Sequence, residues 1–459
     1  MRTHPLTFGQ DTQMGAPIDD SPHVSKDDKA PEESIRAGSR PYNDAWAAIA
    51  WMASVIVVAA FGIIGYHVEA DPDTVPEPRT SVLTVRRLLL IIFTAASSSF
   101  VTSMGLVNLT QKYAREVIYA SNGMLLGIYA ASSVASLSSG NPAGGLIFGV
   151  IFVIHCIFLY VFRQRIPFAA LCLQTSARLT QKHRGMISTA FVFAFAQIGF
   201  VLLWGSGLFD WSNPSSHEMH EAIFWPWLFF LFWSTQVFTG IVHATTCGVV
   251  AMWYFTGGAM PQNPTLGALR RACSFSLGSI CLGSLIVAIL KTVCALLRLL
   301  TRQGGDNHNF LRFVARALVN TVESLMEYFN AYAFVHIAIY GKPYVESAKA
   351  TWQLVKSSAI QGIVNDDFTN TLSLIHVLFC TVLSGIVCGC VFHIPGEEHG
   401  WLIPGAIGAG IAFFVSQTVF QVLSSGVMAL FVCYAEQPDV LRRVNPAFAS
   451  ALMGAIREH

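Results

Sequence analysis

Charged residues are scarce in this sequence. Only 12% of its 459 residues are Asp, Glu, Lys or Arg and 53% are hydrophobic, whereas about 25% of the residues of a soluble globular protein are charged. The first 44 residues hold a disproportionate share of the charges, so the remainder of the chain is poorer still. This composition excludes an ordinary soluble enzyme. The net charge of +1 excludes a protein that attracts nucleic acid by bulk positive charge.

The motifs of the common enzyme classes are also missing. The sequence has no nucleophile elbow, no phosphate-binding loop, no zinc-binding helix motif and no haem-ligation spacing. We therefore expect no enzymatic activity, no cofactor and no metal, and any transport would be passive or driven by a gradient. The ten cysteines lie in or next to apolar runs, which favours buried thiols over disulfides.

Long apolar runs make up most of the chain, and each is long enough for a helix to cross about 30 Å of hydrocarbon. Helices satisfy their own backbone hydrogen bonds in lipid, so the runs predict an all-α polytopic membrane protein with about ten transmembrane helices. The expected spans are Ala45–Gly65, Leu88–Leu109, Val117–Leu137, Gly144–Phe162, Met186–Trp204, Ile223–Phe255, Ala272–Leu300, Phe313–Tyr340, Leu372–Phe392 and Leu402–Tyr434.

The loop charges predict the topology. Lys and Arg concentrate in alternate loops, which places both termini in the cytoplasm. Residues 1–44 are expected to be a disordered cytoplasmic tail, 45–436 the transmembrane domain and 437–459 a cytoplasmic C-terminal tail. Two groups of basic residues do not fit: Arg79, Arg86 and Arg87 before the second span, and Lys291, Arg298, Arg302, Arg312 and Arg316 between the seventh and eighth. A shortened or re-entrant seventh helix would explain the second group.

The eighth span carries a stripe of polar residues on one helical face: Arg316, Asn320, Glu323, Glu327 and Asn330. Such residues are costly in a membrane and do not face lipid. They line either a packed polar seam between helices, with an Arg316–Glu323 type of network, or a water-accessible path. In a path, Glu323 and Glu327, one turn apart, would suit a proton-linked or cation-binding role.

The sixth and tenth spans also carry polar residues on one face. In the sixth these include Trp233, Gln236 and His243, and in the tenth they include Gln421. Trp233 lies deeper than the interfacial tryptophans, where an indole either packs in the core or holds a quaternary ammonium by cation–π attraction. His243 is either a core histidine with satisfied hydrogen bonds or part of a site.

Between the eighth and ninth spans, residues 343–359 form an amphipathic segment. Val345, Trp352 and Val355 fall on one face, and Lys349 and Lys356 lie off it. The segment is expected to be a helix that lies on the inner leaflet, or one that covers the cytoplasmic mouth.

Four ordered blocks from the sixth to the tenth span resemble the choline transporter-like family. They are Phe232-Trp233-Ser234-Thr235-Gln236 leading to His243; Ser276–Ser279 with Gly283–Ile286; Glu323 through Phe329–Ala333 to Ile337–Lys342; and Phe431–Leu441 with Asn445-Pro446. Gln236 and Gln421 follow the pattern of the fungal and protist branch known as pH-nine-sensitive proteins. The resemblance implies a plasma-membrane transporter with ten helices and cytoplasmic termini, and animal members are associated with choline uptake.

Our leading interpretation is therefore facilitated or gradient-driven transport of a small solute, with choline or a related amine as the expected partner besides the lipid bilayer. The path would lie between the sixth, eighth and tenth spans. The expected substrate-binding residues are Trp233, Gln236, His243, Glu323, Glu327, Asn330 and Gln421. The alternative is a non-transporting membrane scaffold or a lipid-handling protein.

Overall fold

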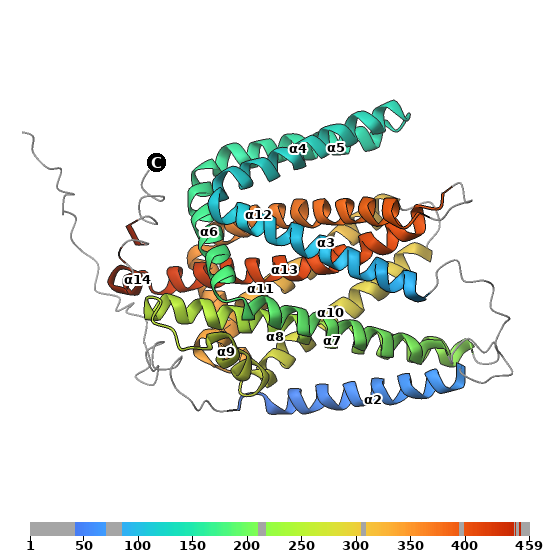
Figure 1. Ribbon diagram of the computed structural model, residues 1–459, viewed down its shortest axis with the longest axis horizontal. Coiled ribbons are helices and arrows are strands. Elements are labelled where there is room, and N and C mark those ends of the chain that lie inside the picture. The colour runs from blue at the N-terminus through green and yellow to red at the C-terminus, as the bar shows by residue number, and fades with distance from the viewer. Residues whose placement is uncertain are drawn as a thin grey trace, which may run out of the picture.

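The computed structural model describes residues 42–69, 85–209, 217–303, 309–393, 399–444, 446 and 449–450, and their regular structure is helical throughout. Long helices lie side by side in a bundle (Figure 1). Their bounds are α2 Ala45–Glu69, α3 Val85–Lys112, α4 Ala114–Ser138, α5 Pro142–Phe162, the 3₁₀ turn η2 Arg163–Arg165, α6 Ile166–Lys182, α7 Gly185–Phe209, α8 His217–Thr256, α9 Pro264–Cys273, α10 Leu277–Gln303, α11 Asn309–Tyr340, α12 Tyr344–Val391, α13 Leu402–Glu436 and α14 Pro438–Val444.

The predicted all-α membrane architecture is confirmed. In the described part of the chain, nine helical segments are long and apolar enough to cross a membrane, with α5 and α6 counted as one segment. Helix α11, at 32 residues, is also of spanning length, but its polar residues lower its hydropathy and keep it out of that set. Helix α10 is continuous over 27 residues, so the suspected shortening of the seventh span is not seen.

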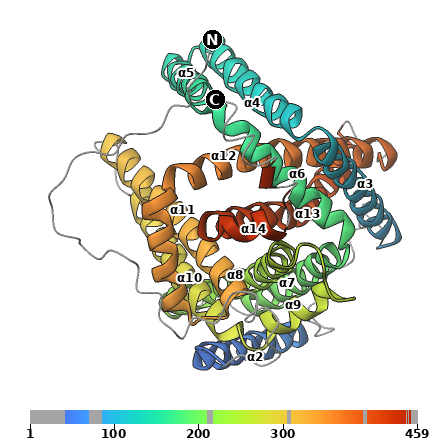
Figure 2. The ribbon, with the colours of Figure 1, turned by 90° about the vertical axis from the view of Figure 1, so that its left-hand side faces the viewer.

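Helix α13 lies at the centre of the bundle, with α8, α12 and α6 around it (Figure 2). The α4–α5 hairpin and α2 lie on opposite sides of the molecule. Glycines allow α13 to approach α12 closely: a Cβ on Gly408 would stand 2.5 Å from the Cβ of Cys388, and a Cβ on Gly405 would stand 3.6 Å from the Cα of Gly389. Gly405 and Gly408 are therefore positions where α13 packs closely against α12. A Cβ on Gly410 would meet no atom of another part of the described chain within 4 Å.

Three described parts of the chain that the apolar runs did not predict are helical, and one of them is α9, between the expected sixth and seventh spans. Helix α6 crosses one end of the bundle, where the sequence suggested a charged loop, and α14 opens the predicted C-terminal tail. The start of α2 and the whole of α14 lie at this same end of the bundle (Figure 1). The predicted topology, with both termini on one side of the membrane, requires this arrangement. That this side is cytoplasmic stays a prediction.

Two residues that precede α2 tie several helices together at this end. The Asn43 side chain donates a hydrogen bond to the carbonyl of Gly341 at 2.7 Å. The Asp44 carboxylate accepts hydrogen bonds from the Ser279 hydroxyl at 2.7 Å and from the backbone N–H of Tyr344, the first residue of α12, at 3.0 Å. These bonds join the start of α2 to the starts of α10 and α12 and to the end of α11. Residues 1–41, most of the predicted disordered tail, lie outside the described part.

Candidate functional site

The two glutamates of the α11 stripe form ion pairs with the neighbouring helix α10. Glu327 lies 2.6 Å from the ammonium nitrogen of Lys291, and Glu323 pairs with the guanidinium of Arg298. Arg298 also donates to the Asn320 side-chain oxygen at 2.8 Å. Both acids therefore have basic partners on an adjacent helix, an arrangement that joins α10 to α11. The side chain of Arg316 lies outside the described residues, so the network suggested for it is untested.

Basic residues that do not fit the loop-charge pattern have structural partners. Lys291 and Arg298 lie on α10 and neutralise the α11 acids. Arg87, near the start of α3, donates to the carbonyls of Phe392 and His393 at 2.8 and 2.7 Å. Those carbonyls follow the end of α12, where a helix presents unsatisfied oxygens and partial negative charge. These three residues therefore bind other helices rather than mark a cytoplasmic loop.

Trp233 and Gln236 lie on α8 in different surroundings. The Trp233 indole is buried, donates to the backbone carbonyl of Cys281 on α10 at 3.0 Å, and packs 5.7 Å from the ring of Phe229. Its polar atom is thus satisfied by protein. Gln236 is half-buried, one turn before Thr239. The polar face of α8 that was predicted for the sixth span therefore contacts α10 at Trp233.

His243 connects three helices. Its Nε2 lies 3.0 Å from the carbonyl of Ala331 on α11, which can only accept, so Nε2 carries a proton and donates. Its Nδ1 lies 2.7 Å from the hydroxyl of Ser425 on α13, which donates to it when the ring is neutral. The imidazole is buried and both of its nitrogens have protein partners. This arrangement matches a core histidine that fixes α8 against α11 and α13.

Asn330 and Gln421 complete the predicted set. Asn330 is buried on α11, its side-chain oxygen has no hydrogen-bond partner, and it faces Gly283 of α10, where an added Cβ would stand 2.6 Å away. Gln421 on α13 donates to the carbonyl of Thr239 on α8 at 3.1 Å. The seven predicted residues therefore lie on three helices, α8, α11 and α13, that contact one another, and α8 and α11 also contact α10. Their role in substrate binding stays a prediction.

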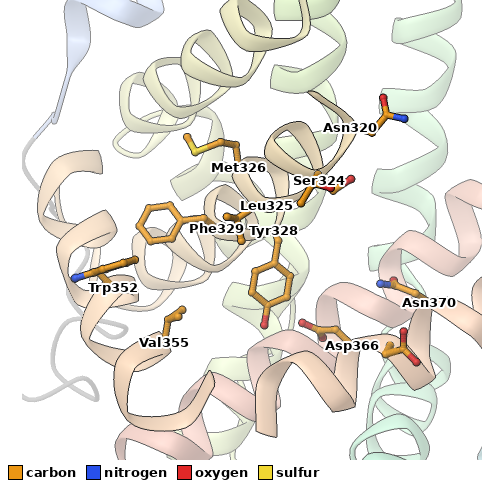
Figure 3. A pocket seen from close by; sticks show the side chains of 12 residues that line it. Asn320, Ser324, Leu325, Met326, Tyr328, Phe329, Trp352, Val355, Asp366 and Asn370 are labelled. Atoms are coloured by element: carbon orange, nitrogen blue, oxygen red, sulfur yellow. The ribbon is translucent and has the colours of Figure 1, made fainter. Parts of the chain in front are cut away.

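A cavity of about 750 Å³ lies between α11 and α12. It is lined by Asn320, Thr321, Ser324, Leu325, Met326, Tyr328 and Phe329 from α11, and by Trp352, Val355, Asp366, Asp367 and Asn370 from α12. In Figure 3, the rings of Phe329 and Trp352 lie on one side, and the Tyr328 hydroxyl points toward Asp366 on the other. The cavity thus combines aromatic rings with carboxylates, although none of the seven predicted residues lines it.

Asp366 is the most buried acid of this cavity, with 3% of its surface exposed. The Tyr332 hydroxyl donates to its carboxylate at 2.6 Å, and Tyr328 approaches the same group. Asp367 is half-buried beside it. Neither acid was among the predicted site residues, because the ninth span was expected to begin at Leu372, whereas α12 continues unbroken from Tyr344. The available signal was the position of these two acids a few residues before an apolar run, where a helix that starts earlier would include them.

The amphipathic segment 343–359 forms the first part of α12. Trp352 and Val345 are 54% and 55% exposed, whereas Ser347 and Thr351 are buried against the protein. Val345 and Trp352 are therefore exposed, as an interfacial helix requires, while Trp352 and Val355 also border the cavity. Among the described residues, no three His, Cys, Asp or Glu side chains are grouped to hold a metal ion.

A family model described as "Plasma-membrane choline transporter" matches residues 146–439, more than half of the sequence. The chain belongs to the choline transporter-like family. A CTL-like protein of Dictyostelium discoideum is 32% identical over 315 residues, which cover 66% of this chain and 56% of that protein. Protein PNS1 of Neurospora crassa is 27% identical over 448 residues, 90% of this chain and 80% of its own length. Protein PNS1 of Cryptococcus neoformans is 30% identical over 336 residues, which cover 66% of this chain and 60% of that protein.

The suspected family is therefore confirmed, including its fungal branch. This choline transporter-like chain spans only 56% of the Dictyostelium protein's length. The segment matched by the family model contains all seven predicted residues and also Asp366 and Asp367. The family match and the apolar helices support a multi-pass membrane protein of a transporter family.

Proposed function

We propose that this protein carries choline or a related small amine across the plasma membrane by facilitated or gradient-driven transport. The observation that carries the proposal is the cavity of about 750 Å³ between α11 and α12, which combines carboxylates with aromatic rings. Small-molecule sites usually have volumes of about 300–1,000 Å³. A permanently charged amine with apolar methyl groups fits such a lining, since rings attract the cation and carboxylates balance its charge.

The helices predicted to form the path are the second support. Helices α8, α11 and α13 meet through polar side chains rather than through apolar packing alone, at His243 and at Gln421. Intramembrane polar contacts of this kind accompany solute pathways. Trp233, Gln236, Glu323, Glu327 and the other predicted residues would then hold or border the path.

Uptake into vesicles tests the function directly. Purified full-length protein reconstituted into liposomes should accumulate labelled choline faster than protein-free liposomes prepared in parallel, and excess unlabelled choline should compete. Imposed pH and sodium gradients would show whether a gradient drives the uptake. Uptake at the protein-free level under every gradient would refute choline as the substrate.

A lipid-handling role is the second candidate, and one observation favours it. Leu325 and Trp352, which line the cavity, are 63% and 54% exposed, so apolar side chains border its opening. An opening of this kind would admit a lipid headgroup from the side. Liposomes that contain fluorescent phosphatidylcholine test this role: the protein should speed exchange of the label between leaflets, and an unchanged exchange rate would exclude it.

A further inference from the structure

We propose that Asp366 and Asp367, with Tyr328, Phe329 and Trp352, form a binding site for a substituted ammonium group between α11 and α12. The identity of the cargo rests on the function proposed above, whereas the site rests on the geometry of these two helices. It differs from the site predicted at Trp233, Glu323 and Glu327, and none of its residues was singled out for binding from the sequence.

The first argument is the missing counter-charge of Asp366. Its carboxylate is almost fully buried, and its contacts are the hydroxyls of Tyr332 and Tyr328. Hydroxyls that donate to a carboxylate stabilise its charged form, but they bring no positive charge. Among the described residues, no Lys, Arg or His nitrogen lies within ion-pair distance of Asp366 or Asp367, although the imidazole of His155 is near enough to Asp367 to interact with it electrostatically. Burial of an unpaired carboxylate is costly, and a cationic ligand removes that cost.

The glutamates of α11 provide an internal comparison. Glu323 and Glu327 lie on the same helix as Tyr328, and each has a basic partner on α10, Arg298 or Lys291. Within the part of the chain that the structure describes, Glu323 and Glu327 thus have basic ion-pair partners, whereas neither Asp366 nor Asp367 has one. Asp366 and Asp367 both line the cavity, where a cationic ligand can approach them.

The second argument is the aromatic lining opposite the acids. Phe329 and Trp352 lie across the cavity from Asp366, with Tyr328 between them (Figure 3). Ring faces attract a cation within about 6 Å, most strongly where water is excluded. Trp352 already shows this: the ammonium of Lys356 lies 5.4 Å from its ring centre. The ligand would take the ring surfaces that face the cavity.

The third argument concerns the class of cation. Leu325, Met326 and Val355 contribute apolar side chains to the lining. In the described part of the chain, no three His, Cys, Asp or Glu side chains are grouped to hold a metal ion. Methyl or methylene groups on nitrogen would instead bury apolar surface there. The shared chemistry is a substituted ammonium, either on a free amine such as choline or on the headgroup of a lipid.

Binding to the purified full-length protein tests the site. The probes are tetramethylammonium and choline, with 3,3-dimethylbutanol as an uncharged analogue of choline, in a maltoside detergent that carries no ammonium group. A ligand that binds the native state raises the melting temperature and is measured independently by equilibrium dialysis. We expect both cations to bind and the uncharged analogue not to bind. Equal binding of the uncharged analogue would overturn the proposal.

Variants assign the binding to the cavity. Asp366→Asn should weaken choline binding about tenfold or more, since one charge partner in a desolvated site is lost. Asp439→Asn is the matched control, because that carboxylate is 78% exposed on α14 and pairs with Arg442 there. Should Asp366→Asn fail to fold, Asp367→Asn and Trp352→Leu, at less buried positions, must each weaken binding. Unchanged binding in the folded variants overturns the site.

Two further arms identify the source of the ammonium group. Short-chain phosphatidylcholine competing with choline, while the matching phosphatidylglycerol does not, would indicate a headgroup site; competition by free amines alone would indicate a solute site. Either result, if it depends on Asp366, supports the proposal. The function and the site can also fail separately. Vesicle uptake of choline with Asp366-independent binding refutes only the site, and Asp366-dependent binding without uptake refutes only transport.

Discussion

Replacing Glu327 with Gln should leave the ammonium of Lys291 without its partner. The two charges are 2.6 Å apart, and at an effective dielectric constant of about 20 their attraction would be about 6 kcal/mol. Much of that is offset by desolvation, and Glu327 is 43% exposed whereas Lys291 is 21% exposed. We expect Glu327→Gln to lower the free energy of unfolding by about 1 to 3 kcal/mol, which lies between the losses typical of exposed and of buried ion pairs.

A double-mutant cycle isolates the pair. Glu327→Gln and Lys291→Met should each lower the melting temperature of the detergent-purified protein, and the double variant should be more stable than the sum of the two losses predicts. The reason is that the double variant leaves no orphaned charge. We expect a coupling energy of about 1 to 2 kcal/mol. Stability changes that simply add would refute the pairing.

The same three variants separate the two roles of Glu327. If Glu327 serves to neutralise Lys291, the double variant should recover choline uptake in vesicles together with stability. If Glu327 binds the substrate, as its position in the polar stripe predicted, the double variant should be stable and transport poorly. Glu323→Gln, measured in parallel, would extend the comparison to the pair with Arg298.

Three further predictions concern helix contacts. Gly283→Ala should lower the free energy of unfolding by about 1 to 3 kcal/mol, because its Cβ would stand 2.5 Å from ring atoms of neighbouring residues. Gly410→Ala, with open space around the added Cβ, should leave the melting temperature unchanged or raise it. His243→Phe should lower the free energy of unfolding by about 1 to 3 kcal/mol, because it leaves a buried hydroxyl and a buried carbonyl unpaired. An unchanged melting temperature would contradict a role of His243 in joining the helices. Asp44→Ala should speed amide hydrogen exchange at the start of α12, where its carboxylate accepts from Tyr344; unchanged exchange would exclude that capping role.

The membrane spans could be predicted because each corresponds to one continuous apolar run in the sequence. The expected tenth span, Leu402–Tyr434, and α13, Leu402–Glu436, differ by two residues at one end. Helices α6 and α9 have amphipathic sequences with basic residues near their ends, and such segments resemble loops when only apolar length is read. Packing against the bundle gives α6 its helical form, and that contribution cannot be read from the segment alone.

The candidate site was predicted only in part. Periodicity placed Glu323 and Glu327 on one face of α11, but it could not show that Lys291 and Arg298 of α10 face them, because pairing between helices depends on tertiary structure. Those basic residues therefore did not fit the loop-charge pattern, and a shortened or re-entrant seventh helix was suspected instead. Asp366 was missed for a related reason: an acid at the edge of an apolar run is assigned to a loop unless the helix is known to continue through it.

Uptake of labelled choline by vesicles that contain the wild-type protein, Asp366→Asn or Asp439→Asn tests the central claim most directly. Asp439→Asn should take up choline at the wild-type rate, because its carboxylate lies on α14 among exposed residues. Asp366→Asn, incorporated in equal amount, should lose uptake about tenfold or more at low choline concentration. Wild-type uptake by Asp366→Asn would contradict an ammonium site between α11 and α12.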